Sequence, residues 1–104
     1  MQTENVTEVA KLNDEFRKSG MGVVVTSGVQ VLENLHLLLD EIRRFSEFSE
    51  DNDPYGEHDF GTVHWYGEKV FWKIDYYDQS MQYGSDPLDS ECKRVLTIML
   101  ASEY

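Results

Sequence analysis

The fold of this chain is decided by the stretch from Asp53 to Asp78, DPYGEHDFGTVHWYGEKVFWKIDYYD, which contains both tryptophans and two of the three histidines. Apolar and polar residues alternate through much of it, and a period of two is typical of strands with one buried face. The first residues are rich in Asp, Pro and Gly, which indicates a tight acidic turn. We therefore expect one β-hairpin that begins at this turn.

The register of the hairpin predicts which side chains join the core. A two-residue turn at Gly67-Glu68 would pair Tyr66 with Lys69. One face of the hairpin is then continuously apolar and consists of Gly61, Val63, Trp65, Val70, Trp72 and Ile74. The opposite face mixes aromatic and charged side chains, so it can stay in water or meet a partner.

One strand and three helices are expected around the hairpin. A thin apolar stripe predicts a helix over residues 3–19, with glycine 20 positioned to cap it. The β-branched run in residues 21–26 predicts a strand. An S-x-x-Q capping box at Ser27 opens a strongly amphipathic helix that continues to Phe45.

The C-terminal segment is interpreted as the third helix. Asp86-Pro87 is typical of a helix start, and the apolar stripe that follows would bury Leu88 and Cys92 up to about Ser102. The element order is then α-β-α-β-β-α. We expect a single α+β domain over residues 1–104, with a small antiparallel sheet of about three strands covered by two or three helices.

Charge restricts the partners of the chain. It has 20 acidic and 9 basic residues, a formal net charge of −11, and seven acids but no Lys or Arg between Arg44 and Lys69. Such a surface repels nucleic acids and anionic membranes and attracts basic proteins. The alternative is that the acidic residues only keep the domain soluble. The single cysteine excludes a disulfide framework, and neither a secretory segment nor a membrane span is present, so we expect a cytoplasmic protein.

The hairpin region also supplies the candidates for chemistry. His58, Asp59 and Asp75 are the residues that could bind a divalent metal or perform acid-base catalysis. His64 and Asp75 are separated by roughly 13 Å along the hairpin, at about 3.3 Å per residue, and cannot share one ion. The alternative for His58 is a structural hydrogen bond to Asp75 that holds the acidic turn against the hairpin. We find no nucleophile, nucleotide or metalloprotease motif and expect no cofactor.

Partner binding is the other role that these residues can have. The carboxylates around the acidic turn and the end of the hairpin are expected to contact a basic partner. They are Glu47, Glu50, Asp51, Asp53, Glu57, Asp59, Asp75 and Asp78.

Several segments resemble a known family. FSEFSEDNDPYGEHDFG, WKIDYYD and RVLTIMLASEY, together with NDEFR and TSGVQVL, are similar to an uncharacterised bacterial family with a domain of unknown function, over residues 13–104. The resemblance implies a small protein associated with plasmids, phages or conjugative elements. It brings no agreed catalytic residues.

Three functions follow as hypotheses. The first is an inhibitor or adaptor of a mobile element, in particular an anti-CRISPR or anti-restriction protein that occupies the basic nucleic-acid-binding surface of a CRISPR effector or restriction nuclease as a DNA mimic. The second is a metal-dependent hydrolase or nuclease that uses His58, Asp59 and Asp75. The third is a structural or regulatory module that self-associates through Tyr66, Phe71 and Tyr77.

Overall fold

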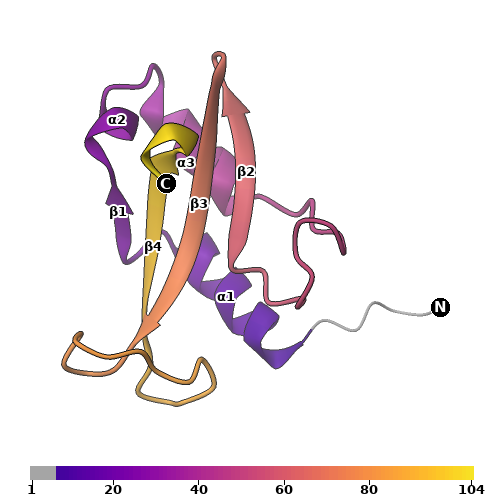
Figure 1. Cartoon of the computed structure of the whole chain (residues 1–104), viewed down its shortest axis with the longest axis vertical. Coiled ribbons are helices and arrows are strands. Elements are labelled where there is room, and N and C mark those ends of the chain that lie inside the picture. Colours follow the sequence, from indigo (N-terminus) through magenta and orange to yellow (C-terminus); the bar gives the residue numbers. More distant parts are fainter. Residues whose placement is uncertain (1–6) are drawn as a thin grey trace.

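The structure, a computed structural model described over residues 7–104, contains helices packed on one face of a mixed four-stranded sheet (Figure 1). The sheet order is β1-β4-β3-β2, with β1 and β4 parallel and the other pairs antiparallel. The elements are α1 (Glu8–Ser19), β1 (Val23–Val25), α2 (Ser27–Gln30), α3 (Leu35–Arg43), β2 (Phe60–Trp65), β3 (Glu68–Tyr77), β4 (Lys93–Leu100) and a 3₁₀ turn (Ala101–Glu103). The predicted α+β class is confirmed, but the sheet has four strands rather than three and is mixed rather than antiparallel, because β1 and β4 run parallel.

The predicted C-terminal helix is wrong, because residues 93–100 form the central strand β4. Its sequence KRVLTIML is apolar on both faces, and such a run satisfies a helical and a strand pattern equally. Val95, Thr97 and Ile98 are β-branched and favour the strand. The segment before β4 is a loop, so Leu88 is 55% exposed instead of buried, and Cys92 is half-buried.

The hairpin is confirmed, but its turn lies one residue earlier than predicted. Tyr66 and Gly67 form the turn with φ values of 48° and 85°, and Trp65 pairs with Glu68. Two positive φ values are typical of a type I′ turn, which needs its glycine at the second position here. Moving the turn by one residue changes the pairing by two, so the predicted faces are unchanged. Val70 and Trp72 are indeed fully buried.

The predicted helix over residues 27–45 is interrupted. It consists of α2 and α3, because Asn34 adopts a left-handed φ of 54° between them. The predicted capping box is wrong: the carboxylate of Glu103 accepts hydrogen bonds from the Gly28 N–H at 3.1 Å and from the Thr26 hydroxyl. A residue from the end of the chain thus caps α2. The core side of α3 is as predicted, with Leu38 and Ile42 buried.

Helix α1 ends as predicted at Gly20, which has a φ of 75°. The predicted start of this helix lies in part outside the described residues, and within them Thr7 is the N-cap. The buried positions of α1 include Asn13 and Arg17 as well as Ala10. A helix that buries an amide and a guanidinium requires partners for both, and these partners build the site described below.

The two faces of the sheet differ. Figure 1 shows α1 and α3 behind the sheet, whereas the face toward the viewer carries only the C-terminal 3₁₀ turn at the end of β4. On this open face the rings of Phe60, Phe71 and Tyr104 lie 5.2 to 6.0 Å apart between centroids. In residues 7–104 no helix is long and apolar enough to cross a membrane.

Candidate functional site

Arg17 connects α1 to the end of α3. Its side chain is 1% exposed, and its Nε and Nη2 donate to the carbonyl oxygens of Ile42 and Phe45 at 3.0 and 2.9 Å. Nη1 contacts Asp14 at 3.1 Å, and the guanidinium lies 5.0 Å from the ring centre of Trp72. Free carbonyls at a helix C-terminus favour a cation, so Arg17 fixes the point where the following loop begins.

Asn13 connects α1 to the sheet. Its Nδ2 donates to the Glu57 carbonyl and to the Tyr76 hydroxyl, both at 2.9 Å, and its Oδ1 accepts from Arg94 Nε at 2.7 Å. All hydrogen-bonding capacity of the amide but one lone pair is used, as a buried amide requires. Burial raises the pKa of Tyr76 to about 12. The cluster is a structural junction, because Asn13 joins α1 to the loop that follows α3, to β3 and to β4.

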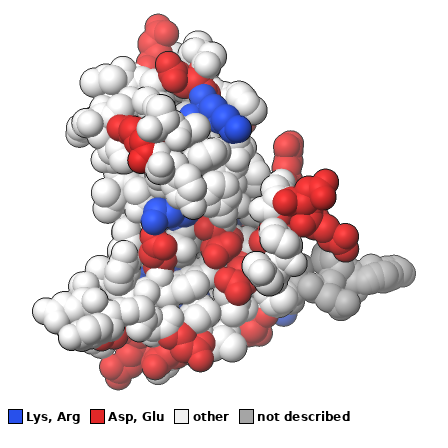
Figure 2. Space-filling view, viewed as in Figure 1, with Lys and Arg blue, Asp and Glu red and all other residues white. Residues whose placement is uncertain are grey.

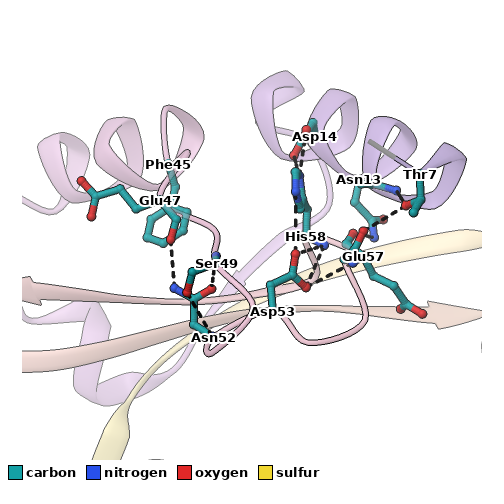
Figure 3. A network of polar contacts seen from close by, with 12 residues as sticks. Thr7, Asn13, Asp14, Phe45, Glu47, Ser49, Asn52, Asp53, Glu57 and His58 are labelled. Carbon is teal, nitrogen blue, oxygen red and sulfur yellow. Dashed lines mark hydrogen bonds and ion pairs between the residues drawn. The ribbon is translucent and has the colours of Figure 1, made fainter. Parts of the chain in front are cut away.

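The α3–β2 loop, residues 44–59, is held in place by one of the predicted partner-binding carboxylates (Figure 3). Asp53, with a side chain 7% exposed, accepts from the backbone N–H groups of Glu57 and His58 at 3.1 and 3.2 Å. The His58 ring stacks on Phe48 at 3.8 Å, and its Nδ1 lies 3.0 Å from Asp14 on α1. His58 has a φ of 55°, which this packing and these bonds impose.

Further bonds close the same loop. Asn52 accepts from the Ser49 N–H and donates to the Glu47 carbonyl, both at 2.9 Å. At the other end, the Thr7 hydroxyl donates to the Gly56 carbonyl at 2.9 Å. Figure 3 shows both the bonds within the loop and the bonds that join the loop to α1. The loop is therefore an ordered structure that belongs to the helix layer.

The three candidate metal ligands are not brought together. His58 is engaged by Asp14 and by Asp53, whose Oδ2 lies 3.7 Å from its Nε2. Asp75 lies on the open face and pairs with Lys73 at 2.8 Å. The predicted hydrogen bond between His58 and Asp75 is therefore wrong, and His58 contacts Asp14 and Asp53 instead. Within residues 7–104 no group of three or more His, Cys, Asp or Glu side chains could hold a metal ion.

The eight predicted partner-binding carboxylates occupy three environments. Glu47, Glu50 and Asp51 are exposed at the outside of the α3–β2 loop, where acidic side chains project to the right in Figure 2. Those used inside the fold or half-buried in it are Asp53, Glu57, Asp59 and Asp75. Asp78 begins the next loop, where a hydrogen bond from the Ser80 hydroxyl lowers its pKa.

Asp59 and Glu57 form an acidic pair near Tyr76. Burial, and then the neighbouring charge of Glu57, raise the pKa of the Asp59 carboxyl above its ordinary value. The Tyr76 hydroxyl lies 3.4 Å from Glu57 Oε1. This pair is less available to an external cation than the exposed acids, because part of its surface is already covered by protein.

Asp78 is the only residue of the β3–β4 loop, residues 78–92, that the sequence interpretation assigned to partner binding. The loop exposes three large apolar side chains: Met81 at 46%, Tyr83 at 68% and Leu88 at 55%. Its carboxylates are Asp78, Asp86, Asp89 and Glu91, and acidic side chains lie along the lower end of Figure 2, where this loop is. The signal was present in residues 78–86, where Gly, Ser and Asp surround Met81 and Tyr83 without a strand or helix pattern.

The carboxylates of this loop bond to their own neighbours. Asp86 accepts from the Leu88 N–H at 2.9 Å, and Asp89 accepts from the Glu91 N–H at 2.8 Å. Such turns hold short segments in shape while the side chains above them stay in solvent. The loop therefore presents apolar and acidic groups together at one end of the sheet.

Comparison with known proteins agrees with the resemblance seen in the sequence. A family model described as a protein of unknown function (DUF3768) matches residues 3–103. No curated protein and no solved structure matches the chain. Because the match covers nearly the whole length, this chain belongs to the DUF3768 family.

Proposed function

We propose that this protein is a small inhibitor or adaptor that binds a partner through its β3–β4 loop. The observation that carries the proposal is the exposure of Met81, Tyr83 and Leu88 beside four carboxylates in one loop. Apolar side chains exposed at one end of a protein are the kind of groups that contact surfaces bury, and aromatic and methionine side chains are enriched there.

The two kinds of side chain have different roles in such a contact. Tyr83 and Leu88 supply the apolar area that becomes buried, and buried anchors of this kind dominate binding energies. The carboxylates select a partner surface that is rich in Lys and Arg and accelerate the encounter. Binding should therefore weaken with salt, because the attraction between exposed charges is screened.

The partner that we propose is a nucleic-acid-binding protein of a defence system, such as a CRISPR effector or a restriction nuclease. Surfaces that bind phosphates are basic, and a protein with a net charge of −11 can occupy them in place of DNA. This role places the protein in the bacterial cytoplasm and fits a gene carried by a phage or another mobile element. The resemblance described in the sequence analysis implies an association with such elements, and this choice rests on it.

The proposal is tested by purifying the tagged protein at low salt from bacteria with defence systems and then measuring the affinity of the purified partner. Two variants separate the roles: Tyr83→Ser with Leu88→Ser removes the apolar anchors, and Glu91→Lys reverses one exposed charge. We expect the double variant to weaken binding by about tenfold or more. Glu91→Lys should mainly slow association and reduce the salt dependence.

The matched control is Glu33→Lys, which reverses an exposed acid beside the hairpin turn, at the opposite end of the sheet from the β3–β4 loop. It should bind like the unchanged protein. If this control weakens binding as much as Glu91→Lys does, the overall charge and not the β3–β4 loop directs recognition. If the apolar double variant binds with full affinity, the proposed surface is wrong.

A further inference from the structure

Strand β2 ends the sheet, and its outer edge is unpaired within residues 7–104. The register decides which backbone groups point outward. In a two-residue hairpin the residues next to the turn, Trp65 and Glu68, form a hydrogen-bonded pair, and every second residue of β2 then bonds to β3. The bond from the Ile74 N–H to the Asp59 carbonyl, at 2.8 Å, continues this alternation.

The N–H and C=O groups of Phe60, Thr62 and His64 consequently face away from β3. Figure 1 shows β2 at the right-hand border of the sheet, with its edge free along most of its length. Proteins usually protect such an edge with Lys, Pro or a bulge. The β2 sequence FGTVHW contains neither Lys nor Pro, and its pairing with β3 is regular over all six residues.

A cleft of about 350 Å³ lies beside this edge. Thr62 and His64 of β2 line one side, and Glu41, Arg44 and Glu47 from α3 and the following loop line the other. An added strand would place alternate side chains toward the helix layer and the remainder over the open face. The side chains on the helix side would enter the cleft next to Glu41, Glu47 and Arg44, where two carboxylates face one guanidinium.

We propose that the β2 edge binds an extended basic segment of a partner protein, which adds as a fifth strand and places Lys or Arg side chains beside Glu41 and Glu47. Unpaired backbone groups supply the affinity in this mode and side-chain pockets supply the specificity. A second copy of this chain is disfavoured, because each copy has a net charge of −11 and β2 contains no Lys or Arg. The proposal concerns another surface than the β3–β4 loop and does not depend on it.

The test uses the full-length ¹⁵N-labelled protein and a seven-residue probe peptide of alternating Thr and Lys, with a Thr and Glu peptide as its control. Strand addition predicts slower hydrogen exchange and large NMR shifts at the amides of Phe60, Thr62 and His64. The amides that already bond to β3, those of Gly61 and Val63, should change little. The Lys peptide should bind at least about tenfold more tightly than the Glu peptide.

Two changes to the interaction sharpen the result. The Glu41→Lys and Glu47→Lys double variant should weaken the Lys peptide by about tenfold or more. A peptide N-methylated on alternate residues keeps its charge but lacks the N–H groups for the edge, so it should lose binding without any change to the protein. Thr62→Pro removes one outward N–H and should act likewise if circular dichroism shows an intact fold.

Other outcomes overturn the proposal. These are no binding at millimolar peptide, equal binding of the Lys and Glu peptides, or shifts that do not alternate along β2. Light scattering that shows a dimer of the unchanged chain but a monomer of Thr62→Pro would assign the edge to a second copy instead. The Leu88→Ser variant separates the two proposals, since it should bind the peptide normally whether or not the β3–β4 loop recognises a partner.

Discussion

The α3–β2 loop and the β3–β4 loop have similar compositions and opposite organisations. Both are acidic, contain several Ser and Asp residues, and have one Pro and one Gly each. The first is bound to α1 through residues far away in the sequence, as the bond between Thr7 and Gly56 illustrates. In the second, the carboxylates of Asp78, Asp86 and Asp89 bond to residues at most five positions further along the chain.

The difference teaches what a carboxylate does in each loop. The Asp53 carboxylate accepts hydrogen bonds from two backbone N–H groups and lies 3.7 Å from a ring nitrogen of His58. It is therefore occupied by contacts inside the fold. Glu91 lies at the surface and keeps its charge available. An acidic composition therefore does not by itself locate a contact surface, and the burial of each side chain decides.

The largest effect is expected where α1 holds the α3–β2 loop. Arg17→Ala should lower the free energy of unfolding by about 3–5 kcal/mol, because it leaves Asp14 and the carbonyls of Ile42 and Phe45 without their buried partner. Urea unfolding monitored by tryptophan fluorescence measures this loss, since Trp72 lies against the guanidinium.

Arg43→Ala is the matched control for this change. Its side chain is 46% exposed and pairs with Asp40 at 3.5 Å on the surface of α3. We expect a loss of about 0.5 kcal/mol or less. Equal losses for the two arginines would mean that the contact between α1 and the α3–β2 loop contributes little.

A smaller effect on the free energy of unfolding is expected when one aspartate from each loop is replaced by alanine. Asp53→Ala should cost about 2 kcal/mol, because the N–H groups of Glu57 and His58 lose their acceptor in a half-buried place. Asp86→Ala removes a similar acceptor from the Leu88 N–H at an exposed position, where water replaces it. Its cost should be about 0.5 kcal/mol or less.

Thermal unfolding of the two variants under the same conditions gives the comparison directly. The midpoint of Asp53→Ala should fall by roughly 8–16 °C and that of Asp86→Ala by no more than about 4 °C. A larger fall for Asp86→Ala would show that the β3–β4 loop is as integrated into the fold as the α3–β2 loop.

The hairpin was predictable because its information is local. The alternation around Trp65 and Trp72 fixes the faces, and these survive an error in the turn because a shift of two residues preserves them. The strand β4 was not predictable in this way, because it carries apolar residues on both faces: Leu96 and Ile98 lie on the helix side, and Val95 and Met99 lie on the open side. Apolar residues on both faces remove the period that distinguishes a strand from a helix.

The acidic loops show the same limit for the candidate site. The sequence identifies Asp53 and Glu50 as acids in one polar segment but contains no local sign that the first will be buried and the second exposed. The relevant contacts, such as that of His58 with Asp14, join residues 44 positions apart. Only the tertiary arrangement separates a carboxylate that holds the fold from one that is free for a partner.

The smallest expected effect is a difference between the two loops in how the ionisation of one aspartate changes stability with pH. Burial raises the pKa of Asp59 in the α3–β2 loop, whereas the Ser80 hydroxyl lowers the pKa of Asp78 in the β3–β4 loop. Asp59 therefore opposes folding above its folded-state pKa, and this opposition disappears as pH falls to its ordinary value of 3.8. Asp78 supports folding above 3.8, and its support is lost as pH falls through its lower folded-state pKa.

Carboxyl ¹³C NMR should consequently find Asp59 titrating at a higher pH than Asp78. Asp59→Asn should stabilise the protein at pH 7 by about 0.5 kcal/mol or less, because solvent screens a half-buried group, and the gain should vanish below pH 3.8. Asp51→Asn, an exposed change in the same loop, is the control and should show no gain at either pH. If Asp59 and Asp78 titrate in the reverse order, the covered and the exposed loop have been assigned the wrong way round.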